Sequence, residues 1–140
     1  MPEEPRKSRE PWEYVLHIPH DPRAVPVARR TLRLILAAHE LAAHSDPAEL
    51  LATELVSNAV RHTKGPAALR IRWANGLLRV GAWDADPTPP TPQTHVAPDA
   101  EQGRGLDLIR ACADGWGWQP YVTCGETGKH VWCELGTAVA

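Results

Sequence analysis

The chain has 140 residues, which is long enough for one domain with a substantial hydrophobic core. Its formal net charge is -2 and its 15 basic residues form no tract, so the composition gives no indication of direct nucleic-acid binding. No apolar run approaches the roughly 18 residues of a membrane span, and the N-terminal segment is polar. We therefore expect a cytoplasmic protein without a membrane partner.

The cysteines are odd in number and show no paired spacing. This pattern suits buried thiols in a reducing compartment and gives no support to a disulfide framework or a zinc site. The cysteines are Cys112, Cys124 and Cys133.

The N-terminal segment, residues 1–11, is charged and contains three prolines, so we expect a disordered arm before a single domain over residues 12–140. Residues 12–18 alternate between apolar and polar, which predicts a strand. One face of this strand would carry Tyr14, Leu16 and Ile18.

A helix is predicted next, from Arg23 or Pro26 to Ala42. Pro26 would lie in the first turn, because a proline deeper in a helix costs about 3 kcal/mol. Helical spacing predicts a buried side made of Val27, Thr31, Leu34, Ile35 and Ala38, opposite the arginines Arg29, Arg30 and Arg33.

The central segment, residues 49–63, has the pattern of an amphipathic helix. Asp46 suits its N-cap, Pro47 its first position, and Glu49 would complete a capping box. The predicted apolar stripe consists of Ala52, Leu55, Val56, Ala59 and Val60.

Glu54 and Asn58 are one helical turn apart at the border of this stripe, so their side chains would project side by side. An amide oxygen is a hard ligand for magnesium, and a carboxylate can accept a proton. Arg61 and His62 continue the same polar edge. Taken alone, the pair also fits an ordinary solvated helix edge.

Residues 67–74 and 77–84 alternate as the two strands of a hairpin, and Asn75-Gly76 between them is a strong type I′ turn signal. The second strand ends at Asp84, where a side chain can face a site beyond the sheet.

Residues 87–102 contain five prolines and no periodicity, which is typical of a lid, a binding loop or a disordered segment. Gly103-Arg104-Gly105-Leu106 follows and opens a predicted helix that ends near Ala113. Glycines at a helix start allow close approach of a ligand, and the N–H groups there attract phosphate. A plain loop-to-helix junction is the alternative, because G-x-G alone is weak.

The C-terminal part has strand character. Short strands are predicted at residues 115–119 and 121–124, a turn at residues 126–128, and a longer strand at residues 129–135. In the last strand Val131, Cys133 and Leu135 would face inward, and His130, Trp132 and Glu134 outward. Two roles are open for Trp116, Trp118 and Trp132, either packing in the sheet or stacking on bases, and the lack of a basic groove favours packing.

This order of motifs resembles the GHKL superfamily of ATPases and kinases, and within it the stand-alone bacterial serine kinases of the anti-sigma-factor group. The resemblance implies an α+β fold, a two-layer α/β sandwich called the Bergerat fold, with a mixed, mostly antiparallel sheet and about three helices on one face. The matching segments are ELVSNAVRHT (Glu54–Thr63), LRVGAWDADP (Leu78–Pro87), GRGLDLI (Gly103–Ile109), ADGWGW (Ala113–Trp118) and GKHVWCEL (Gly128–Leu135).

The resemblance also implies ATP and Mg²⁺ as cofactors. Asn58 would hold Mg²⁺, Glu54 would act as the general base toward a partner's hydroxyl, and Asp84 would accept a hydrogen bond from the adenine amino group. The nucleotide would also meet Gly103, Arg104, Gly105, Leu106, Arg61 and His62, under a lid formed by residues 87–102. The implied partners are an anti-sigma-antagonist (STAS-type) protein or a sigma factor, and relatives suggest a homodimer.

The chain departs from the family pattern in two places. Glycines usually follow the strand-end aspartate as D-x-G-x-G, whereas Ala85, Asp86, Pro87 and Thr88 follow it here. His130 stands where a small hydroxyl residue often helps to hold adenine. Two hypotheses result: an active protein serine kinase, favoured by the retained Glu54 and Asn58, and a non-enzymatic interaction module, favoured by Asp86, Thr88 and His130.

Overall fold

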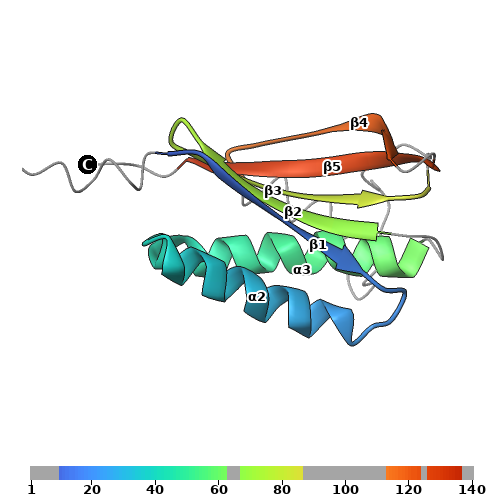
Figure 1. Cartoon of the computed structure of the whole chain (residues 1–140), viewed down its shortest axis with the longest axis horizontal. Coiled ribbons are helices and arrows are strands. Elements are labelled where there is room, and N and C mark those ends of the chain that lie inside the picture. Colours follow the sequence, from blue (N-terminus) through green and yellow to red (C-terminus); the bar gives the residue numbers. More distant parts are fainter. Residues whose placement is uncertain (1–9, 63–66, 87–112, 124–125, 137–140) are drawn as a thin grey trace, which may run out of the picture.

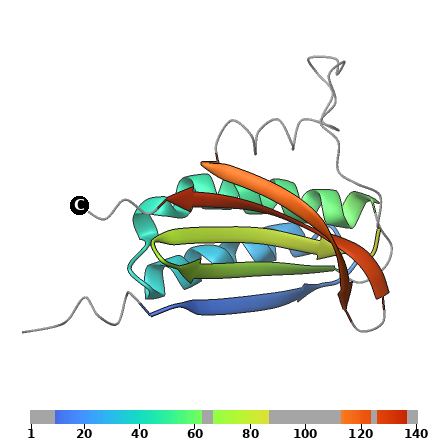
Figure 2. The ribbon, with the colours of Figure 1, turned by 90° about the horizontal axis from the view of Figure 1, so that it is seen from above.

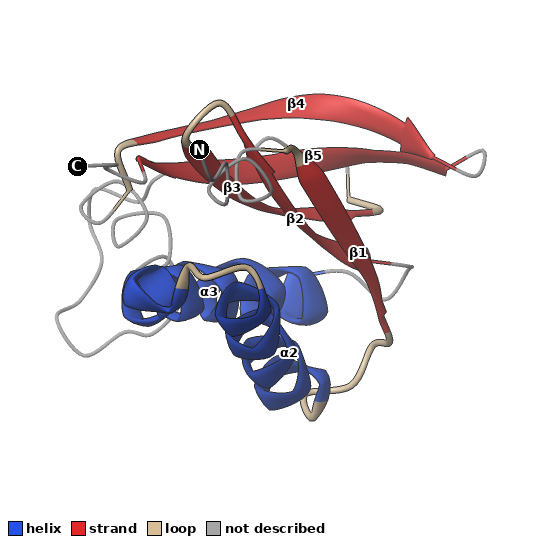
Figure 3. Ribbon diagram, turned by 60° about the vertical axis from the view of Figure 1, so that its left-hand side comes forward, coloured by secondary structure: helices blue, strands red, loops and turns tan. Residues whose placement is uncertain are grey.

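One antiparallel sheet with two helices on a single face forms the body of the protein (Figures 1 and 3). The computed structural model describes residues 10–62, 67–86, 113–123 and 126–136. The elements are β1 (Trp12–Ile18), α2 (Ala24–Ala38), the 3₁₀ helix η1 (Ala42–His44), α3 (Ser45–His62), β2 (Ala67–Ala74), β3 (Leu77–Asp84), β4 (Gly115–Thr123) and β5 (Glu126–Gly136).

The strand order is β1-β2-β3-β5-β4, and Figure 2 shows the strands crossing above the helix layer. The predicted α+β two-layer sandwich is therefore confirmed. All four pairings between the described strands are antiparallel, so the expected mixed sheet is not seen in this part of the chain. The expected third helix, the N-terminal arm up to residue 9 and the lid at residues 87–102 lie outside the described residues.

The β2–β3 hairpin forms as predicted from its turn. Asn75 and Gly76 have φ values of 55° and 77°, and a type I′ turn requires positive φ at both central positions. The turn sets the register, which pairs Ala74 with Leu77 at one end and Ala67 with Asp84 at the other.

The C-terminal hairpin differs from the prediction. β4 is one continuous strand that contains Pro120, which is tolerated because β4 is the edge strand and needs no hydrogen bond on its outer side. The predicted turn at residues 126–128 is wrong, because these residues begin β5 and pair with residues 121–123.

Helix α2 is shorter than predicted and buries a different side. It ends at Ala38, and Glu40, with φ 63°, turns the chain into η1. Val27 and Leu34 are 61% and 70% exposed, so the predicted buried stripe is wrong except at Ile35, which is buried. The buried residues are Ala24, Ala28, Leu32, Ile35 and Leu36. The helix is apolar on more than one side, and its packing against α3 and the sheet selects the side that is buried.

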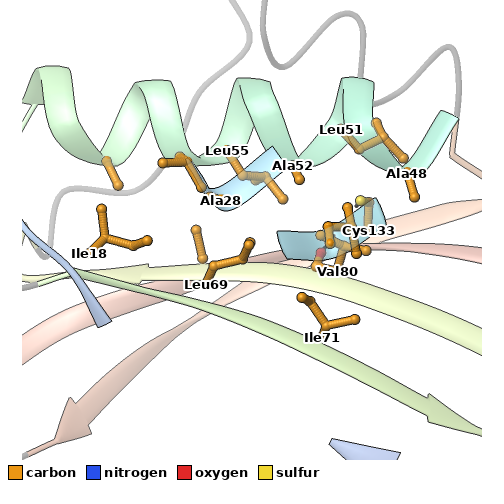
Figure 4. Close-up of a cluster of buried hydrophobic side chains, with 14 of the residues drawn as sticks. Ile18, Ala28, Ala48, Leu51, Ala52, Leu55, Leu69, Ile71, Val80 and Cys133 are labelled. Carbon is orange, nitrogen blue, oxygen red and sulfur yellow. Dashed lines mark hydrogen bonds between the residues drawn. The ribbon is translucent and has the colours of Figure 1, made fainter. Parts of the chain in front are cut away.

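Helix α3 buries the predicted stripe, because Ala52, Leu55, Val56, Ala59 and Val60 are all at most 9% exposed. Figure 4 shows side chains of α3 pointing toward those of the sheet. The predicted capping box is not formed. The helix begins at Ser45 directly after η1, which places Asp46 inside the first turn, and Glu49 forms an ion pair with Arg33 of α2.

The tryptophans divide between the two faces of the sheet. Trp116 and Trp118 of β4 pack against the helix-side core, as the packing interpretation predicts. Trp132 lies on the opposite face, where the Arg79 guanidinium carbon is 5.0 Å from the centre of its ring. Within the described residues, no helix has the length and apolarity needed to cross a membrane.

Candidate functional site

The polar edge of α3 carries the first part of the candidate site. Glu54 and Asn58 are half-buried and lie one turn apart beside the buried stripe. Arg61 is exposed, and its Nη1 donates a 3.5 Å hydrogen bond to Oδ1 of Asn58, a length at the upper limit for such a bond. The Asn58 oxygen is therefore held only weakly by Arg61. Nothing in the structure describes the side chain of His62.

Asp84 provides the second part, at the carboxyl end of β3. It continues the helix-side row of Leu78, Val80 and Ala82 and is 5% exposed. The strand register aligns Asp84 with Ala67 on one side and Lys129 on the other. This end of β3 and the last turns of α3 lie at the same end of the molecule (Figure 1). The fold thus brings the C-terminal end of α3 and the Asp84 end of β3 to the same end of the molecule.

The Asp84 carboxylate belongs to a buried ion pair. Nζ of Lys129 lies 3.0 Å from Oδ1 of Asp84, and the two side chains are only 10% and 8% exposed. The backbone N–H of Asp86 donates to the same oxygen at 2.9 Å, and Lys129 also donates to the Asp86 carbonyl oxygen at 2.9 Å. Burial raises the pKa of the Asp84 carboxyl, and the Lys129 hydrogen bond opposes this by favouring the ionised form.

The sequence interpretation missed Lys129, although a signal was present. The alternation of β5 places Lys129 on the same inward face as Val131, Cys133 and Leu135. A lysine is almost never buried on a core face without a charged partner. The inward position of Lys129 could therefore be detected from the alternation, whereas its pairing with Asp84 follows from the strand register.

Gly128 allows β5 to approach Asp84 closely. A Cβ at this position would lie 1.9 Å from the carbonyl oxygen of Asp84, so any larger residue would collide with backbone. The family pattern expects glycines after the aspartate, where this chain has Ala85 and Asp86. In this chain Gly128 of the neighbouring strand β5 makes the close contact with the Asp84 backbone instead.

His130 does not lie beside Asp84, which corrects the expectation that it replaces an adenine-holding residue. It pairs with Trp83 on the face away from the helices and contacts the rings of Tyr121 and Trp132. A Cβ at Gly81 would lie 2.4 Å from its Nε2, so the missing side chain makes room for the imidazole. Among the described residues, Nε2 has no hydrogen-bond partner.

The stability of the protein should fall as the pH drops from about 6.5 to about 4, in part because of His130. Burial, followed by the charges of Arg70 and Arg79, lowers its pKa from 6.5 to about 4. In that range the unfolded chain binds about one proton that the native state excludes, so acid favours unfolding. We expect urea unfolding of His130→Gln to lack this part of the pH dependence. If the free energy of unfolding depended on pH identically in the wild type and in His130→Gln, this role of His130 would be contradicted.

One predicted part of the site, Gly103, Arg104, Gly105 and Leu106, lies outside the described residues. Two of the three predicted buried thiols, Cys112 and Cys124, also lie outside them. Cys133 is a buried thiol, as predicted, and donates to the Val80 carbonyl oxygen at 3.4 Å. Burial raises its pKa to about 12.

The described residues contain no group of three or more histidine, cysteine or acidic side chains that could hold a metal ion by themselves. On α3, Asn58 offers an amide oxygen, which is a type of ligand that Mg²⁺ accepts, and the Glu54 carboxylate lies one helical turn away. Magnesium in phosphoryl-transfer sites is commonly held by one or two protein groups together with the substrate phosphates. The donor set therefore fits a magnesium ion that arrives with a nucleotide.

The two-layer sandwich, with Glu54 and Asn58 on α3 and Asp84 at the end of β3, has the features expected of an ATP-binding domain of the GHKL superfamily. A family model described as the histidine kinase-like ATPase domain matches residues 18–133, and the chain belongs to that family. A comparison with curated proteins finds no match to the chain.

Proposed function

We propose that this protein is an ATP-dependent protein serine/threonine kinase of the anti-sigma-factor type. It would phosphorylate an anti-sigma-antagonist (STAS-type) partner and regulate transcription by partner switching, with a sigma factor as the second partner and a homodimer as the assembly. The observation that carries the proposal is the half-buried Glu54–Asn58 pair on α3, a helix whose C-terminal end lies at the same end of the molecule as the end of β3, where Asp84 is buried. The family match supplies the ATP-binding class.

Each residue has a defined task in this proposal. Asn58 holds Mg²⁺, which neutralises phosphate charge when bound, and Asp84 accepts a hydrogen bond from the adenine amino group. Glu54 takes the proton of the partner's hydroxyl as that oxygen bonds to the γ-phosphorus and ADP departs. The remaining phosphate contacts would come from N–H groups of Gly103, Arg104, Gly105 and Leu106, with Arg61 and His62 nearby.

A second candidate is an interaction module that has lost catalysis. One observation favours it: Asp84 is already paired with Lys129 in a buried site, so part of the carboxylate that would receive adenine is occupied. In this case ATP would serve as a structural ligand or would be absent.

Titration with ATP and ADP, with and without Mg²⁺, separates the kinase from the nucleotide-free form of the second candidate. A ligand bound only by the folded state raises its stability, by about 2.7 kcal/mol at 100 times its dissociation constant. We expect Mg²⁺–ATP to raise the melting temperature of the wild type, and Asn58→Ala to weaken the dependence on Mg²⁺. Melting curves that Mg²⁺–ATP leaves unchanged would favour the nucleotide-free interaction module.

A further inference from the structure

The Asp84 carboxylate uses only one of its two oxygens within the described part of the protein. Oδ1 accepts hydrogen bonds from both Lys129 Nζ and the Asp86 backbone N–H. The described residues provide no hydrogen-bond partner for Oδ2. The ion pair thus fixes the orientation of the carboxylate, and the described residues leave its Oδ2 as an acceptor for a ligand.

Lys129 likewise has an N–H donor that makes no hydrogen bond to the described residues. An ammonium group has three N–H donors, and Nζ donates one to Asp84 Oδ1 and one to the Asp86 carbonyl oxygen. The third donor lies beside the carboxylate, and the described residues provide no hydrogen-bond partner for it. The two buried side chains therefore present an acceptor and a charged donor next to each other at the end of β3 and β5.

We propose that Lys129 contacts the nucleotide base together with Asp84 and determines base specificity. Asp84 Oδ2 accepts from the 6-amino group of adenine, and Lys129 Nζ donates to the neighbouring N1 atom. This inference rests on the proposed ATP site, and it adds a direct contact to the base from a residue that the family pattern does not assign.

The alternative is a purely structural ion pair. A buried pair of this kind contributes little net stability, and well-packed apolar residues can often replace it without loss. A purely structural ion pair would also have no need for the acceptor at Asp84 Oδ2 and the third N–H donor of Lys129 that the described residues do not use. The two roles differ in a testable way, because only a base contact depends on the N1 atom of the ligand.

The first test uses the unmodified protein and 1-deazaadenosine triphosphate, in which N1 is replaced by C–H. Hydrogen bonds to charged groups are strong, so we expect this analogue to bind at least about 10-fold more weakly than ATP by calorimetry. Equal affinities would overturn the proposal while leaving the ATP site intact. Absence of binding by ATP itself would instead contradict the proposed function on which the inference rests.

The second test removes the donor. In Lys129→Met, ATP and 1-deazaadenosine triphosphate should bind with equal affinity, because the group that distinguishes them is gone. Lys129→Arg keeps a charged donor and should retain a preference for ATP. If Lys129→Met binds both nucleotides more weakly but keeps the wild-type ratio between them, Lys129 only positions Asp84 and the proposal fails. If Lys129→Met does not fold, the comparison of ATP with 1-deazaadenosine triphosphate in the wild-type protein decides between a base contact and a structural pair.

Discussion

Glu54→Gln is expected to lower the rate of phosphoryl transfer by about 100- to 10,000-fold, the usual contribution of a general base. Glutamine has nearly the same shape as glutamate and fits the same half-buried position on α3, but it cannot take a proton from the attacking hydroxyl. The affinity for Mg²⁺–ATP should stay within about 3-fold of wild type, because the proton transfer belongs to the chemical step. The measurement is transfer of labelled γ-phosphate to a purified STAS-type partner, together with calorimetry of nucleotide binding.

Glu49→Gln is the matched control for this experiment. Glu49 lies on the same helix, but its carboxylate pairs with Arg33 of α2 instead of lying on the Glu54–Asn58 edge. The Glu49→Gln substitution should leave the rate of phosphoryl transfer unchanged. A Glu54→Gln protein that phosphorylates the partner at the wild-type rate would remove Glu54 from the mechanism, even if nucleotide binding is normal.

Gly128→Ala should destabilise the protein by about 3 kcal/mol or more, or prevent folding. The added methyl group would lie 1.9 Å from the carbonyl oxygen of Asp84. A backbone atom in a paired strand cannot move away as a flexible side chain can, so β5 and β3 would have to separate next to the ion pair. Urea unfolding monitored by circular dichroism would measure the loss.

Two other glycines of the same sheet serve as controls. At Gly115 the nearest atom to an added Cβ is a Glu134 side-chain oxygen at 3.5 Å, an ordinary contact, so Gly115→Ala should cost less than about 1 kcal/mol. Gly81→Ala should be destabilising because of His130, and the loss should shrink in Gly81→Ala combined with His130→Ala. Wild-type stability of Gly128→Ala would contradict the close approach of β5 to Asp84.

The sequence alone determined the features that depend on near neighbours in the chain. The Asn75-Gly76 turn, the β1 strand and the stripe of α3 from Ala52 to Val60 were all predicted and confirmed. The same local logic placed Glu54 and Asn58 on one helix edge and Asp84 at a strand end. Turn geometry, strand alternation and helical period act over a few residues, so the sequence shows them directly.

The tertiary structure decided the features that depend on contacts between distant segments. Packing against α3 chose Leu32 and Leu36 over Val27 and Leu34 as the buried side of α2, although both sets have helical spacing. Strand alternation already predicted that His130 faces outward, but only the β3–β5 register placed Lys129 against Asp84 and His130 against Trp83. A shift of that register by one residue would exchange the Lys129 and His130 side chains, because successive residues of a strand face opposite sides. The charge beside Asp84 therefore depends on strand pairing, which no short stretch of the sequence encodes.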